Sequence, residues 1–171
     1  MILSRNEVAA MLHKAARGQG MPLGHADDFV AAAVLALGVY EDFADQVTLA
    51  LAGPHTCTQT RVAMAGPVAI DALLCGEEEI ALPMLDSPEL LSAMLCIAYD
   101  NRGLSAAIDV TKGGLVLRRS ADFIHAEPVP GPLDIPDKEW AQWQIWAADT
   151  YVPATDQSRL SGAGAGLTDN D

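Results

Sequence analysis

"LSAAIDVTKGGLVLRR", residues 104–119, is the stretch where the spacing of apolar residues changes from helical to strand-like. From residue 104 to residue 110, apolar side chains recur at every second position, which is typical of a half-buried strand. The four residues "TKGG" at 111–114 then supply a turn, because glycine adopts positive φ at little cost. The stretch therefore predicts a β-hairpin across residues 104–119.

Helical spacing on both sides of the hairpin predicts five helices. The first follows a capping box, in which Ser4 accepts from the amide of Glu7 and the Glu7 carboxylate reaches back. We expect Gly18 and Gly20 to end this helix and Gly38 to end the second. Short connections between these helices favour an antiparallel helical layer. The predicted helices span residues 5–17, 25–37, 40–52, 88–99 and 137–149.

Two other stretches complete the predicted fold. Residues 53–86 fit either strand or buried helix, because Gly66 and Pro67 interrupt an apolar run that suits both. The stretch "ADFIHAEP", residues 121–128, predicts a third strand. The sequence thus predicts one α+β domain over residues 1–171. Its parts are the helical layer, a small antiparallel sheet and a C-terminal helix that bears the tryptophans.

Tryptophan and cysteine positions predict what is buried. The tryptophans Trp140, Trp143 and Trp146 recur at a spacing of three, so they drift around the last helix instead of forming one stripe. We expect Trp140 or Trp143 to be mostly buried, and another to lie at a partner surface or in the core. Cys75 and Cys96 lie in apolar runs, so we expect both thiols to be reduced and inert.

The charge balance excludes several classes of partner. Ten basic residues face 23 acidic ones, which gives a net charge of −13. This field repels phosphate backbones and anionic lipid, so we expect neither nucleic acid nor a membrane as a partner. The sequence also lacks an apolar run of the roughly 18 to 20 residues that a spanning helix needs. With no pattern of a signal peptide at its start, the chain is expected to be cytoplasmic.

Both ends of the chain resemble a known family. "KAARGQGMPLGHADD", residues 14–28, and "TYVPATDQSRLSGAGAGLTDND", residues 150–171, are similar to segments of a family of short bacterial proteins of unknown function. Members open with S-x-x-E and K-A-A-R-G-x-G and close on G-A-G-A-G-L-T-D-N-D. The resemblance implies no activity, cofactor or substrate. It does imply that the closing segment is part of the folded unit.

The closing segment, residues 158–171, contains three alternating glycines. It does not fit a dinucleotide fingerprint or a phosphate-binding loop, because neither the required strand and helix nor a Gly-Lys-Ser/Thr follows. Alternating glycines suit a backbone that is pressed against another surface and can cup an anion with its amides. We therefore expect the segment to pack on the body of the domain, with Leu167 as its anchor. A mobile tail is the alternative.

The candidate ligand-binding residues are arginines that suit an anion, together with residues of the closing segment. Arg118 has a second interpretation, since charge on a strand also discourages unwanted pairing. His55 and Cys57 are too few for a zinc site, so we expect neither metal nor cofactor. Residues 77–79, three glutamates, are interpreted as a solvated turn. The candidates are Arg17, Arg118, Arg159, Gly162, Gly164, Gly166, Asp169 and Asp171.

Two classes of function fit this sequence. The first is a small-molecule binding site, with an anionic ligand as one option, partly walled by the segment "GAGAGLTDND". The second is a non-catalytic accessory or interaction subunit, which could be a homodimer. A concave pocket favours the first class, and an exposed apolar patch that includes a tryptophan favours the second. Whether the protein is an enzyme stays open.

Overall fold

The structure is a computed structural model that describes residues 1–52, 60–121, 123 and 125–150. Helices predominate in this part of the chain, and two small antiparallel sheets accompany them, which confirms the α+β class. The elements in chain order are β1 (Ile2–Leu3), α1 (Arg5–Gly18), α2 (Leu23–Val39), α3 (Ala44–Leu51), α4 (Val62–Leu74), β2 (Glu79–Leu82), α5 (Pro88–Arg102), β3 (Ala106–Thr111), β4 (Gly114–Arg119), β5 (Leu133–Asp134) and α6 (Asp137–Ala148).

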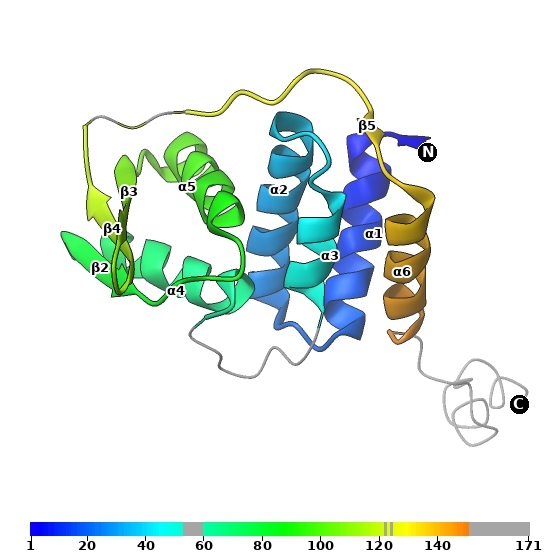
Figure 1. Ribbon diagram of the computed structural model, residues 1–171, viewed down its shortest axis with the longest axis horizontal. Coiled ribbons are helices and arrows are strands. Elements are labelled where there is room, and N and C mark those ends of the chain that lie inside the picture. Colours follow the sequence, from blue (N-terminus) through cyan, green and yellow to red (C-terminus); the bar gives the residue numbers. More distant parts are fainter. Residues whose placement is uncertain (53–59, 122, 124, 151–171) are drawn as a thin grey trace, which may run out of the picture.

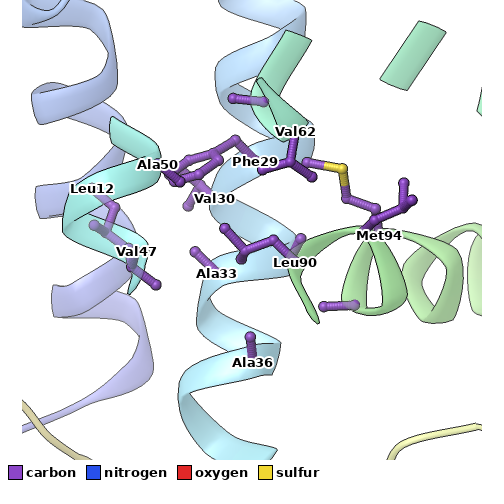
Figure 2. Close-up of a cluster of buried hydrophobic side chains, with 14 of the residues drawn as sticks. Leu12, Phe29, Val30, Ala33, Ala36, Val47, Ala50, Val62, Leu90 and Met94 are labelled. Atoms are coloured by element: carbon purple, nitrogen blue, oxygen red, sulfur yellow. The ribbon is translucent and has the colours of Figure 1, made fainter. Parts of the chain in front are cut away.

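The helices are arranged around α2 (Figure 1). Helix α1 runs antiparallel to α2, as predicted, and α6 lies beside α1. On the other side of α2 lie α5 and α4, and the three-stranded sheet packs beyond them. Figure 2 shows the apolar core at the centre, where Leu12, Phe29 and Leu90 come from α1, α2 and α5. None of the helices among the described residues is long and apolar enough to span a membrane.

Helix α1 begins with the predicted capping box. The Ser4 hydroxyl accepts from the Glu7 amide at 3.2 Å, and the Ser4 amide donates to the Glu7 carboxylate at 2.9 Å. The Ser4 hydroxyl also donates to the Glu7 carboxylate at 2.7 Å, and this bond, together with the bond from the Ser4 amide, lowers the pKa of the Glu7 carboxyl. A capping box of this kind satisfies amides that the start of a helix leaves without partners. The helix ends at Gly18, one residue later than predicted.

The prediction that Gly38 ends α2 is wrong. The helix continues through Gly38 to Val39, and the glycine is needed for packing. A Cβ atom at this position would lie 2.3 Å from Nη2 of Arg5. The Arg5 guanidinium donates to the carbonyls of Val34 at 3.1 Å and Val129 at 2.6 Å, so it ties α1, α2 and the connector before β5 together.

Helix α3 is shorter than predicted and starts at Ala44 instead of residue 40. Residues 41–43 form a turn, in which Asp42 has a φ of 54°. This left-handed conformation interrupts the helix, and aspartate tolerates it better than most residues do. The apolar spacing from Tyr40 onward did not reveal the break, because Phe43 is buried in the turn and so preserves the apolar pattern of the sequence.

The ambiguous stretch 53–86 contains both kinds of element in its described part. Helix α4 includes Pro67, and β2 follows a turn at Gly76. Proline lacks the amide that would bond to the carbonyl four residues earlier, which made a break the natural expectation. Gly66 instead brings α4 close to α5, since a Cβ atom there would lie 2.7 Å from the Met94 sulfur.

The predicted hairpin is confirmed as β3 and β4, joined by a two-residue loop between Thr111 and Gly114. The third strand of this sheet is β2, in the order β2-β4-β3. The expectation of a strand at residues 121–128 is wrong for the residues described there. The interpretation of residues 77–79 as a solvated turn also needs correction, because Glu79 begins β2 and pairs with Arg118.

Trp143 on α6 is fully buried, which confirms the burial predicted for Trp140 or Trp143. Its indole Nε1 donates to the Thr48 hydroxyl of α3 at 2.8 Å. Trp140 and Trp146 are half-buried against the same core. Cys96 is buried, whereas Cys75 follows the end of α4 and is exposed, so the apolar surroundings expected for Cys75 are not present. Both described thiols are free, as expected.

Candidate ligand-binding basin

The described residues do not bring the predicted ligand-binding arginines together. Arg118 on β4 and Arg17 on α1 belong to elements on opposite sides of α2 (Figure 1). Arg118 lies between Glu79 at 2.8 Å and Asp109 at 3.3 Å on the exposed face of the sheet. Arg17 donates to the carbonyl of Met21 at 2.6 Å and so stabilises the turn between α1 and α2.

The other candidates lie outside the described residues. So do His55 and Cys57, and the closing segment with its expected packing. The candidates outside the description are Arg159, Gly162, Gly164, Gly166, Asp169 and Asp171.

An open basin of about 720 Å³ lies where three segments distant in sequence meet. One wall is the corner between α2 and α3, residues 37–44. Met1 and the segment 134–137, where β5 leads into α6, form the facing wall, and Val129 of the connector adds an edge. Binding sites for small molecules commonly have volumes of roughly 300–1,000 Å³. The basin therefore has the size of a small-molecule site.

The wall at the α2–α3 corner combines an aromatic pair with two carboxylates. The rings of Tyr40 and Phe43 lie 5.2 Å apart between centroids, and Phe43 is buried while Tyr40 is half-buried. Burial raises the pKa of the Tyr40 phenol, and Cys96 and Glu89 add to the rise. The Tyr40 hydroxyl is therefore protonated at neutral pH. The two residues between the rings, Glu41 and Asp42, are exposed.

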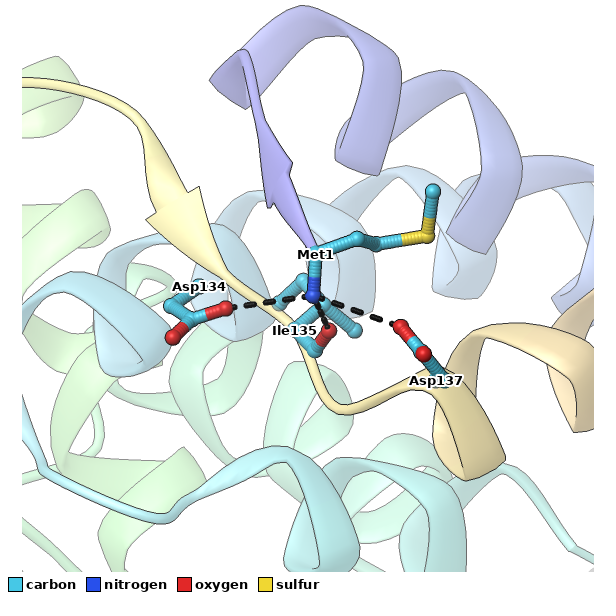
Figure 3. A network of polar contacts seen from close by, with 4 residues as sticks. All are labelled: Met1, Asp134, Ile135 and Asp137. Atoms are coloured by element: carbon cyan, nitrogen blue, oxygen red, sulfur yellow. Dashed lines mark hydrogen bonds and ion pairs between the residues drawn. The ribbon is translucent and has the colours of Figure 1, made fainter.

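The facing wall is organised around the amine of Met1 (Figure 3). This amine donates to the Ile135 carbonyl at 2.5 Å, to Oδ1 of Asp134 at 3.2 Å and to Oδ1 of Asp137 at 3.5 Å. The pairing of β1 with β5 brings these groups together, because its register sets Ile2 opposite Asp134. Asp137 is also the first residue of α6, where its negative charge interacts favourably with the helix dipole.

The ionisable groups that line the basin are mostly acidic. Besides the neutral Tyr40 phenol, the described lining contains four carboxylates, those of Glu41, Asp42, Asp134 and Asp137, and one amine, that of Met1. The Met1 amine pairs with Asp134 and Asp137. Among the described lining residues, no cation is therefore left to pair with the carboxylates of Glu41 and Asp42. Within the described ranges, no three acidic, histidine or cysteine side chains are placed to hold a metal ion. The spread carboxylates suit an extended organic cation better than a compact ion.

Because of the Met1 amine, we expect the stability of the protein to decrease as the pH rises in the alkaline range. Hydrogen bonding to Asp134 raises the pKa of this amine; partial burial opposes the rise, and the charges of Asp134 and Asp137 add to it. A raised pKa in the folded state means that the stabilisation is complete below about pH 8. It is lost as the pH rises through the folded-state pKa. We expect urea unfolding at pH 7 and pH 10 to show this loss, and the variant Asp134→Asn/Asp137→Asn to lack that part of it. An equal loss in both chains would contradict the assignment.

Asp42 should be replaceable only by residues that accept left-handed backbone. Because its φ is 54°, Asp42→Ala is expected to lower the free energy of unfolding by about 1 kcal/mol. Asp42→Gly and Asp42→Asn should leave stability unchanged or raise it slightly. Chemical denaturation of the three variants measures this, with Glu41→Ala as the matched neighbour. A loss for Asp42→Asn as large as for Asp42→Ala would mean that the aspartate side chain, and not its backbone, stabilises the corner.

Reasoning from the sequence did not single out the four carboxylates of the basin. Two of them are adjacent, at positions 41 and 42, and two are three residues apart, at positions 134 and 137. More than ninety positions of an acidic chain separate the two pairs. An excess of acidic residues is a signal for cationic partners in general, yet it does not say which carboxylates converge. The convergence depends on the pairing of β1 with β5 and on the Arg5 contacts to Val34 and Val129.

Comparison with known proteins gives one match. The model of a family described as "Protein of unknown function (DUF3726)" matches residues 3–41, which cover α1, α2 and the first part of the α2–α3 corner. No curated protein and no solved structure matches the chain. Over residues 3–41, which include part of one wall of the basin, the chain is therefore similar to a family of unknown function.

Proposed function

We propose that this protein binds a small organic molecule with two or more cationic groups, of the diamine or polyamine class, in the basin between the α2–α3 corner and the start of α6. The observation that carries the proposal is a basin of small-molecule size whose charged groups, among the described residues, are four carboxylates and a single amine. The charges select a cation, and the presence of carboxylates on two separate wall segments favours a ligand that carries more than one positive group.

The aromatic pair supports an organic ligand over an inorganic one. Tyr40 is half-buried in the lining, and the face of a tyrosine ring attracts alkylammonium groups. Val129 and Met1 at the edge are exposed apolar side chains, which can contact the methylene groups of such a ligand. Carboxylates for the charges and apolar side chains for the carbon chain are what a polyamine requires.

The anionic ligand considered from the sequence finds less support in the lining of this basin. Gly38 lines the basin, and the arginine beside it is Arg5. The Arg5 guanidinium already donates to the carbonyls of Val34, Val129 and Gly131. The expectation that the segment "GAGAGLTDND", residues 162–171, walls a ligand site remains a proposal, independent of the basin.

Isothermal titration calorimetry with spermidine as the probe tests the proposal. Glutarate, an anion of comparable length, serves as the control ligand. We expect saturable binding of spermidine that weakens with added salt, and no binding of glutarate. Saturable binding of glutarate, or no spermidine binding at low ionic strength, would overturn the proposal.

A charge-removing variant locates the binding. Glu41→Gln/Asp42→Asn removes two carboxylates and keeps a residue that tolerates the φ of position 42. Because an exposed ion pair contributes about 0.2–1 kcal/mol, we expect the affinity for spermidine to fall roughly two- to thirtyfold. The matched control is Glu77→Gln/Glu78→Gln, which removes two exposed charges near the sheet. Equal losses in the two variants would mean that spermidine follows net charge and not the basin.

A further inference from the structure

A second, smaller pocket of about 60 Å³ opens where α2, α4 and α5 meet. Its floor is apolar and includes Ile70 of α4 with Met94 and Ile97 of α5. Its mouth is polar and carries both signs of charge, from Asp28 of α2 and Arg102 of α5. This pocket shares no residue with the basin described above.

The polar groups at the mouth have unused hydrogen-bonding capacity. Arg102 donates one hydrogen bond, from Nη1 to Oδ1 of Asp71 at 3.2 Å, and its other guanidinium donors make no hydrogen bond to the described residues. Within the same ranges, the Asp28 carboxylate and the side-chain amide of Asn101 have no hydrogen-bonding partner. An arginine with free donors and a carboxylate with free acceptors at one opening can bind groups of opposite charge.

The surroundings of Asp28 are unfavourable for its charge. Partial burial raises the pKa of the Asp28 carboxyl, and the neighbouring Asp71 adds to the rise, while Arg102 and His25 oppose it. A carboxylate whose charge is disfavoured in the free protein gains more than an ordinary surface carboxylate when a cation approaches it.

We propose that this pocket binds a small zwitterion of the amino-acid class, with its carboxylate on Arg102, its ammonium group on Asp28 and its short carbon chain on the apolar floor. The size limits the ligand, since each water-sized position takes up roughly 10–15 Å³. The pocket therefore holds about four to six such positions, which fits glycine, alanine or β-alanine.

The test is a two-dimensional amide NMR titration of the full chain with alanine, glycine and β-alanine. Acetate and methylammonium, which each carry half of the zwitterion, are titrated separately. We expect saturable shifts at residues of α2, α4 and α5 that line the pocket, and an affinity for the zwitterion that exceeds that for either half by about tenfold or more. Shifts with acetate as strong as those with alanine would overturn the two-point arrangement. The absence of saturable shifts for all three zwitterions would overturn the site.

Two variants separate recognition from folding. Asp28→Asn keeps the shape and removes the charge, and we expect it to weaken alanine binding by about tenfold. Arg102→Gln should do the same and leave methylammonium unaffected. The control Glu127→Gln removes an exposed charge from the connector. The spectra themselves report whether each variant is folded, and unchanged alanine affinity in a folded Asp28→Asn would contradict the proposal.

Discussion

Trp143→Ala is expected to lower the free energy of unfolding by about 3–5 kcal/mol, the range measured when a buried tryptophan or phenylalanine becomes alanine. Trp143 is fully buried and is the largest of the fully buried side chains among the described residues. It anchors α6, whose other tryptophans are only half-buried. Its removal leaves a cavity between α6, α1 and α3, and it leaves the Thr48 hydroxyl without the indole donor.

Two further variants apportion this effect. Trp143→Phe keeps an aromatic ring and removes the hydrogen bond to Thr48, so we expect a smaller loss than for alanine. Trp140→Ala is the matched control on the same helix, because Trp140 is half-buried. Urea unfolding measures all three. A loss for Trp140→Ala equal to that for Trp143→Ala would show that Trp143 is not the anchor of α6.

Gly18→Ala is expected to destabilise the protein by about 1–3 kcal/mol, toward the upper end, because the added methyl group meets backbone. A Cβ atom at Gly18 would lie 1.8 Å from the carbonyl oxygen of Trp146. Neither α1 nor α6 can relieve this contact by changing a side-chain rotamer, so the two helices must move apart. The half-buried Trp146 would lose part of its packing in the same movement.

For Gly24, near the start of α2, we expect the opposite effect, namely that replacement by alanine stabilises the protein. Apart from its chain neighbours and the adjacent backbone of α2, a Cβ atom at Gly24 would have no atom of the described residues within 4 Å, so Gly24→Ala meets no obstacle. In a helix interior this substitution stabilises by about 0.5–1 kcal/mol, and less near the end. Thermal unfolding should therefore move in opposite directions for Gly18→Ala and Gly24→Ala. A stabilised Gly18→Ala would mean that α1 and α6 do not approach as closely as the structure shows.

Local signals in the sequence predicted the elements whose cause is local. The capping box of Ser4 and Glu7 and the alternation in residues 104–119 each depend on neighbours a few positions away, and both are present. Gly38 misled the prediction, because a glycine at this position makes room for the Arg5 guanidinium, which comes from another helix. A glycine that permits close approach and a glycine that ends a helix look the same in one sequence.

The sequence left the strand β2 undecided and missed the basin for a related reason. Strand β2 is only four residues long, and its pairing with Leu117 and Arg118 on β4 is what makes it a strand. The basin needs the α2–α3 corner, β1 and the start of α6 to meet, and no spacing within any one of them predicts that contact. Charge composition argued against nucleic acid and membranes as partners, while the candidate arginines directed attention to anionic ligands.

The location of spermidine binding is the sharpest test of the proposed function. In a two-dimensional amide NMR titration of the full chain, we predict saturable shifts confined to the basin, at residues 37–44 and 134–137 and at Val129. The shifts should weaken in Glu41→Gln/Asp42→Asn and persist in Glu77→Gln/Glu78→Gln. Shifts of similar size at residues 77–79 and in the basin, or no saturable shift anywhere, would contradict the proposed function.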